Sequence, residues 1–204
     1  MKKHLFILGA LVFFACNLGF AQRISLESGS LDFLKGLKEL KIQYDYSDLK
    51  VGKKTEAEYV TDKVDSKNKK EPGSGDKWKE AWINDRSKAY EPKFEELFNK
   101  YMGEKGITGG VNLTNAKYIM IVHTTVIEPG YNIGISRQNA YTSYTITFKD
   151  AADPSKDVAV LSIDNSPGAS FGGYDFDNAA RVGEAYAKCG KALAGFLIKK
   201  GGLK

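Results

Sequence analysis

The sequence predicts an α+β fold in which an antiparallel-rich sheet of about four strands packs against two long helices. Several short segments have apolar residues at every second position, which is typical of half-buried strands. Two longer stretches repeat apolar residues at three- and four-residue spacing, as amphipathic helices do. These elements follow the order strand, helix, strand, strand, strand, helix, which favours helices layered on one sheet.

The first strand is expected from Leu40 to Tyr46, where apolar and polar residues alternate. Residues 22–36 before it are mostly polar and predict a lead-in with at most one helical turn. Residues 50–77 after it are rich in lysine and contain few large apolar side chains. We therefore expect an exposed excursion there, with one short element near Glu56 to Val64.

A long helical stretch is expected from Asp76 to Met102, with Asp76 capping its first turn. Pro92 interrupts the pattern, and a proline inside a helix costs about 3 kcal/mol. The sequence therefore predicts either a kink or two consecutive helices with Pro92 in the first turn of the second.

Three further strands are expected to form an antiparallel meander. The segment from Ala116 to Glu128 is apolar on both faces, which is typical of a strand at the centre of a sheet. The segment from Ala140 to Phe148 alternates regularly and places Tyr144 and Ile146 on the same face. Turn-forming residues separate it from the segment from Val158 to Asp164, which indicates a hairpin.

The last helix is expected from Asn178 to Lys200, with Asp177 before it as a cap and Gly201 after it as a stop. One of its faces carries only small residues, including Gly183 and Gly190. Glycine inside a helix costs about 1 kcal/mol relative to alanine, so these positions need compensation. We expect them to let the helix lie close against the sheet; a helix–helix seam between two copies is the alternative.

Residues 1–21 have the parts of a signal peptide: two lysines, an apolar run from Leu5 to Ala15, and small residues up to Ala21. The apolar run is too short to span a bilayer. Cleavage after Ala21 leaves residues 22–204 as a single exported domain, periplasmic or secreted. A weaker match to a bacterial lipobox leaves lipidation of Cys16, and an outer-membrane lipoprotein with membrane contact, as the alternative.

The composition argues against several classes of function. The chain has 30 basic and 25 acidic residues, and removal of residues 1–21 takes away Lys2 and Lys3. The remaining charges are interspersed, whereas nucleic-acid binding needs a concentrated basic stripe. The expected domain keeps one cysteine, Cys189, and one histidine, His123, so it has no internal disulfide and no zinc site of the usual composition. We expect no cofactor and no bound metal.

The letters GASFG at residues 168–172 match G-x-S-x-G, the pattern around the nucleophilic serine of many hydrolases. In those enzymes the catalytic histidine follows the serine, whereas His123 precedes Ser170. Pro167 also separates the motif from the preceding strand, and the chain after Ser170 is too short for the rest of that fold. We therefore expect a protein that is not an enzyme; a hydrolase that uses Ser170 and His123 is the alternative.

The loop from Gly130 to Tyr144 holds the candidate ligand-binding residues. Aromatic rings beside amide and guanidinium groups are what sugar or peptide recognition uses. The candidates are Tyr131, Asn132, Arg137, Asn139 and Tyr141, with Gln138 and Tyr144 beside them. The expected ligand is a glycan or another envelope protein, and an ordinary polar hairpin loop is the competing interpretation.

The layout also carries a resemblance. The strand KIQYDYSDL, the helix end FEELFNKYMGEKGI, the strand AKYIMIVHTTVIE and the closing helix ARVGEAYAKCGKALAGFLIKKG resemble the small exported domains of unknown function found in Bacteroidetes and other Gram-negative bacteria. The architecture is similar to the N-terminal domain of TolB and to related envelope lipoprotein domains. This resemblance implies an envelope location and a non-catalytic binding or assembly role. It supplies no functional residues and leaves the oligomeric state open.

Overall fold

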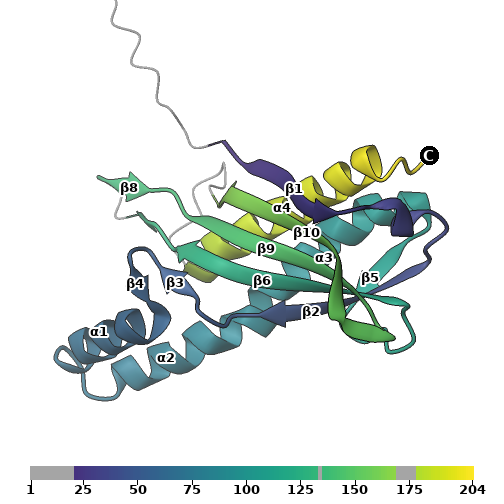
Figure 1. Cartoon of the computed structure of the whole chain (residues 1–204). Helices are drawn as coiled ribbons and strands as arrows, with labels where there is room; N and C mark the ends of the chain where they lie inside the picture. The colour runs from purple at the N-terminus through teal and green to yellow at the C-terminus, as the bar shows by residue number, and fades with distance from the viewer. Residues whose placement is uncertain (1–20, 133–134, 169–177) are drawn as a thin grey trace, which may run out of the picture.

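The computed structural model of this chain describes residues 21–132, 135–168 and 178–204, which form an eight-stranded mixed sheet with helices packed on one side (Figure 1). The α+β class is confirmed, but the expectation of about four strands and two helices is wrong. Across the sheet the strands run in the order β1 (Arg23–Gly29), β10 (Asp153–Pro167), β9 (Tyr141–Asp150), β6 (Tyr118–Glu128), β2 (Glu39–Asp45) and β5 (Thr108–Gly110). Of two further short strands, β3 (Lys50–Val51) pairs with β6, and β4 (Lys54–Thr55) pairs with β3.

The predicted meander is confirmed, with β6 antiparallel to β9 and β9 antiparallel to β10. Between β6 and β9 the chain makes a separate hairpin of β7 (Tyr131–Asn132) and β8 (Arg137–Gln138). β2 pairs with the other side of β6 in the parallel direction, because the chain crosses from β2 to β6 through several helices.

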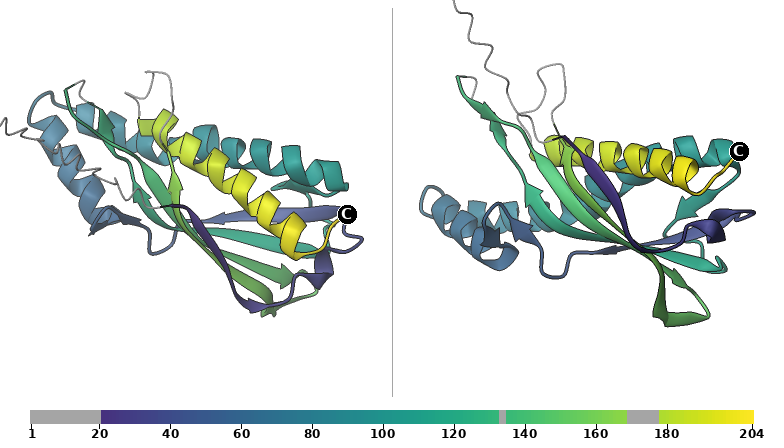
Figure 2. Two further views of the ribbon diagram at one scale, coloured as in Figure 1. Left: turned by 90° about the horizontal axis from the view of Figure 1, so that it is seen from above. Right: turned by 45° about the horizontal axis from the view of Figure 1, so that its top comes forward.

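The helices α3 (Glu91–Met102) and α4 (Asn178–Lys200) lie side by side over the same face of the sheet (Figure 2). At one end of the sheet, α1 (Glu56–Asn68) and α2 (Ser74–Asp85) project together. Short 3-10 turns occupy η1 (Asp32–Leu34) and η3 (Gly103–Lys105). α2 continues into α3 through a π-helical turn, η2 (Arg86–Tyr90), and Pro92 lies in the first turn of α3, as the sequence predicted.

The core lies between the sheet and the two long helices. Side chains from alternate positions of β6 and β9 point toward the helices, while α3 and α4 each present an apolar face to them. The fully buried members include Met120, Val122, Ile146, Phe148, Phe94, Phe98, Leu193 and Leu197.

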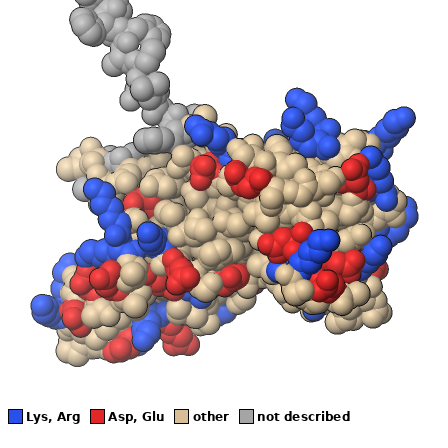
Figure 3. Space-filling view, viewed as in Figure 1, with Lys and Arg blue, Asp and Glu red and all other residues tan. Residues whose placement is uncertain are grey.

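The opposite face of the sheet is not covered by α3 or α4. It carries half-buried β-branched residues in its middle, Ile119, Ile121, Thr145, Thr147 and Val160. Figure 3, viewed onto this face, shows a central area with few charges between two charged ends.

The small-residue face of α4 packs against α3, not against the sheet as the sequence suggested. A Cβ atom added at Gly190 would lie 2.3 Å from the backbone oxygen of Phe94, and one added at Gly183 would lie 3.5 Å from that of Ala89. Glycine is thus needed at Gly190 because the two helix backbones nearly touch there. This contact joins two helices of one chain, whereas the alternative raised from the sequence was a seam between two copies.

The lysine-rich region 50–77 is more ordered than the expected exposed excursion. A capping box starts α1: the Thr55 hydroxyl accepts the Glu58 backbone N–H, and the Glu58 carboxylate accepts the Thr55 N–H. The helix it starts is 13 residues long. We call residues 54–85, which contain α1 and α2, the α1–α2 lobe.

Candidate functional site

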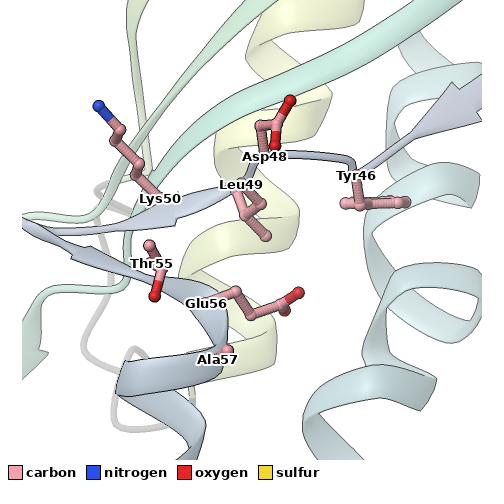
Figure 4. Close-up of a pocket in the computed structure, with 7 residues that line it drawn as sticks. All are labelled: Tyr46, Asp48, Leu49, Lys50, Thr55, Glu56 and Ala57. Atoms are coloured by element: carbon pink, nitrogen blue, oxygen red, sulfur yellow. The ribbon is translucent and has the colours of Figure 1, made fainter.

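A hollow of about 340 Å³ lies where the α1–α2 lobe meets the sheet (Figure 4). We call it the Tyr46 pocket. Seven residues from the end of β2 through the first turn of α1 line it: Tyr46, Asp48, Leu49, Lys50, Thr55, Glu56 and Ala57.

The turn after β2 shapes one wall of the pocket. The Asp45 carboxylate accepts the backbone N–H of Ser47 at 2.8 Å and its hydroxyl at 2.9 Å, which folds the chain back on itself. Burial opposes ionisation of Asp45, but these hydrogen bonds from Ser47 and the nearby His123 outweigh it and lower the pKa of the carboxyl. Asp48 then adopts a left-handed backbone conformation with φ of 55°.

The charged group at the centre of the site is Glu56. Its carboxylate accepts the indole N–H of Trp82 at 2.7 Å and accepts Arg86 Nη2 with both oxygens, at 2.5 and 2.7 Å. The guanidinium of Arg86 also lies 4.2 Å from the ring centroid of Tyr46. α1, α2 and the end of β2 therefore meet at one ion pair, whose side chains are only 19% (Arg86) and 22% (Glu56) exposed.

Behind the pocket, two tyrosines of the β2 region donate to carboxylates of α3. Tyr46 Oη donates to Glu91 Oε1 at 3.1 Å, and Tyr44 Oη donates to Glu95 Oε1 at 3.4 Å. Burial raises the pKa of both phenols far above the ordinary value, and the nearby carboxylates raise it further. Burial also raises the pKa of Glu91 and Glu95, although the tyrosine hydrogen bonds oppose the shift. The phenols therefore remain neutral donors at physiological pH.

The arrangement supplies binding groups. Figure 4 shows Leu49 and the Glu56 carboxylate directed toward the space beside the Tyr46 ring, whereas the Lys50 side chain points away from that ring. The residues that line the hollow thus include an apolar side chain, a ring, a paired carboxylate and both signs of charge. None of the seven lining residues is a serine, cysteine or histidine.

The candidate loop residues from the sequence do not line this pocket. The structure pairs Tyr131 with Gln138 and Asn132 with Arg137 across the β7–β8 hairpin. Tyr131 is 43% exposed, and Asn139 is also exposed. Tyr141 is half-buried at the start of β9, and Tyr144, only 2% exposed, belongs to the core. Its inclusion among the loop candidates is therefore wrong, because Tyr144 shares the helix-facing side of β9 with Ile146.

A residue that the sequence analysis missed fixes the base of this hairpin. Arg181 on α4 is 3% exposed and donates through Nε to the Pro129 oxygen at 2.9 Å and through Nη2 to the Gly130 oxygen at 3.3 Å. It also donates to the side chain of Asn178. A single arginine among small and apolar residues of an amphipathic helix was the only signal in the sequence.

Of the two residues in the hydrolase hypothesis, Ser170 and His123, the structure describes His123. Ser170 lies outside the described residues, so its predicted role stays untested. His123 lies on the open face of β6, and its Nε2–H donates to the Ser47 backbone oxygen at 2.7 Å. His123 thereby holds the turn that forms one wall of the Tyr46 pocket.

The described part of the chain contains neither a cluster of metal-ligating side chains nor a membrane-spanning helix. Within residues 21–132, 135–168 and 178–204, no three His, Cys, Asp or Glu side chains cluster closely enough to hold a metal ion. The helices in those same ranges are each too short or too polar to cross a bilayer.

Comparison with known proteins gives no family. No family model and no curated protein matches the sequence. A PelC dodecamer from Paraburkholderia phytofirmans is similar in structure, with TM-score 0.38, 9% identity, and coverage of 82% of this chain and 96% of that one. Protein XCC0632 from Xanthomonas campestris, of the DUF330 family model, gives TM-score 0.39, 11% identity, and coverage of 81% and 86%. Similarity at these TM-scores carries no argument about function.

Proposed function

We propose that this protein is an exported, non-catalytic module that binds another protein of the cell envelope through the Tyr46 pocket. The observation that carries the proposal is one unusual backbone feature in the lining of the hollow and a second one next to it. Asp48, which lines the hollow, has a positive φ, and Arg86, whose side chain pairs with the lining residue Glu56, opens a π-helical turn. Both conformations are uncommon, and both recur at functional sites.

The size and lining of the pocket support a protein ligand. A hollow of about 340 Å³ is at the small end of ligand sites, so it suits a side chain or two of a larger partner. Leu49 and Tyr46 give it an apolar interior, and its lining also includes the oppositely charged Asp48 and Lys50. A protein segment with an apolar anchor and mixed flanking charges complements that pattern.

The test places a photo-crosslinking amino acid at Lys50 and identifies adducts formed in the native cell envelope. We expect an adduct with one envelope protein. Ala57→Trp fills the mouth of the pocket from an exposed helical position, so it should reduce the adduct at least about tenfold.

The matched control is Ala152→Trp, which adds the same side chain at an exposed turn between β9 and β10. It should leave the adduct unchanged. No adduct from position 50, or an adduct equally strong with Ala57→Trp, would contradict the proposal.

The β7–β8 hairpin favours a second candidate function, glycan binding, because Tyr131 presents a 43% exposed ring beside the exposed Asn139. Tyr131→Ala and Tyr141→Ala should then abolish retention on a polysaccharide column. Unchanged retention of both variants would remove this candidate.

A further inference from the structure

The two edge strands of the sheet differ in whether their outer backbone groups are hydrogen-bonded. At one edge, the side-chain amide of Asn99 binds β5: Asn99 Nδ2 donates to the Gly109 oxygen at 2.8 Å, and the Gly109 N–H donates to Asn99 Oδ1 at 2.7 Å. The amide thus replaces a neighbouring strand, and this edge is closed to further pairing.

The other edge, β1, is open. All of its residues except Glu27 pair with β10 on one side, and within residues 21–132, 135–168 and 178–204 no strand pairs with its other side. β1 is mostly exposed, and the Leu26 side chain is 41% exposed. An exposed edge strand of this kind is a template for pairing with another chain.

The sequence of β1 is complementary to itself in the antiparallel direction. If a second copy pairs with residues 23–27 around Ser25, Arg23 lies opposite Glu27, and Ile24 lies opposite Leu26. Each pair occurs twice, as a two-fold axis requires. Opposite charges and apolar residues directly across from each other both stabilise a sheet.

The structure places the two charged residues on the same face, where such pairs could form. Arg23 lies directly across from Asp164 on β10, and the Ser162 hydroxyl donates to Glu27 Oε1 at 2.6 Å. Asp164 and Ser162 are two residues apart on one strand, so they share a face. Glu27 is the residue at the β-bulge between Leu26 and Ser28, and its side chain is held on this face by Ser162. Regular pairing of β1 stops at this residue, which limits the proposed pairing to residues 23–27.

We infer that this protein forms a two-fold dimer through β1, with Arg23 of each copy opposite Glu27 of the other and the two sheets joined into one. The paired segment is short, so we expect dissociation in the micromolar range and weakening by salt. The inference does not depend on the Tyr46 pocket, which lies at the opposite side of the sheet from β1 (Figure 1).

The test is sedimentation equilibrium of the exported protein from about 1 to 200 μM, a range that brackets the expected affinity. The wild type should show twice the monomer mass at the upper concentrations. Arg23→Glu places two carboxylates opposite each other, and Glu27→Arg places two guanidinium groups opposite each other. Each change should weaken the dimer at least about tenfold, since like charges directly across strands repel.

The double variant Arg23→Glu with Glu27→Arg restores opposite charges and should restore the dimer. Lys199→Glu, a charge reversal at an exposed position of α4, is the matched control and should dimerise like the wild type. Circular dichroism checks that each variant is folded. Any of three outcomes would overturn the inference: a wild type that stays monomeric throughout the range, single variants that dimerise like the wild type, or a double variant that stays monomeric. A monomeric wild type would mean that the charges of Arg23 and Glu27 protect the edge strand against pairing with other chains.

Discussion

The main body of the molecule, which we define as the sheet with α3 and α4, and the α1–α2 lobe are each stabilised by different interactions. α4 buries most of its inward face, and the helix backbones of α3 and α4 come into direct contact at Gly190. In the lobe, α1 buries only Val60, and α2 only Gly75 and Trp82. The lobe depends instead on ring contacts and on the ion pair between Glu56 and Arg86.

This difference predicts two levels of stability in one chain. Regions with few buried apolar contacts open locally at a lower free energy than the global unfolding. The Tyr46 pocket lies at the boundary, with Tyr46 following β2 of the body and Glu56 starting α1 of the lobe. A ligand bound there as proposed would contact both regions, so we expect binding to close the lobe onto the body.

The largest expected effect is in the body. Gly190→Ala places a methyl group 2.3 Å from the Phe94 backbone oxygen, so the two helices must separate. We expect the free energy of unfolding to fall by about 2 to 3 kcal/mol, measured by urea denaturation.

Gly195→Ala is the matched control on the same helix. An added Cβ at Gly195 meets nothing within 4 Å, so the better helix propensity of alanine should raise the free energy of unfolding by about 0.5 to 1 kcal/mol. Equal effects of the two substitutions would show that helix propensity, and not the contact with α3, decides the outcome.

The same contrast explains which elements the sequence predicted. α4 and β6 are long and strongly periodic, and their predicted bounds match closely. β3 and β5 have two or three residues and exist because β6 and β2 lie beside them, which no local pattern reveals. α1 has few apolar residues, so the sequence predicts only a short element near Glu56 to Val64 within an exposed excursion, whereas the helix runs to Asn68; Thr55 and Glu58 carry the sequence signature of the capping box that starts it.

The site was less predictable than the fold. Glu56 and Arg86 are 30 positions apart, and their pairing depends on how α1 and α2 fold against each other. Tyr144, by contrast, could have been placed correctly: its predicted strand face already included Ile146, so the alternation itself indicated burial. A residue that the strand pattern places on the buried face is therefore a poor candidate for ligand binding, even when its side chain has suitable chemistry.

An intermediate effect is expected at the link between the two regions. Arg86→Met keeps an apolar side chain over Tyr46 but leaves the Glu56 carboxylate, 22% exposed, without its cation. We expect local opening of the lobe to become easier by about 1 to 2 kcal/mol. Hydrogen exchange should show faster exchange in α1 and α2 and no change in α4.

Lys54→Met is the control for this substitution. Lys54 pairs with Asp62 in the same lobe, but both side chains are more than half exposed. Exposed pairs of this kind contribute little, so exchange in α1 should stay as in the wild type. If both variants loosened α1 equally, the lobe would depend on its total charge and not on the Glu56–Arg86 contact.

The smallest effect is a dependence of stability on pH where α3 packs on β2. Burial raises the folded-state pKa of Glu95, so its stabilising contribution is complete below the unfolded carboxyl pKa and is lost as pH rises through the folded value. Glu95→Gln keeps an oxygen that accepts from Tyr44 and removes the charge. Because Glu95 is partly exposed, we expect the Glu95→Gln substitution to raise the free energy of unfolding by only about 0.5 kcal/mol at pH 8 and not at pH 4.

Glu96→Gln, at an exposed neighbouring position, is the control and should show no such trend in urea denaturation at the two pH values. A gain for Glu95→Gln of the same size at both would mean that the charge of Glu95 is not what opposes packing of α3 on β2.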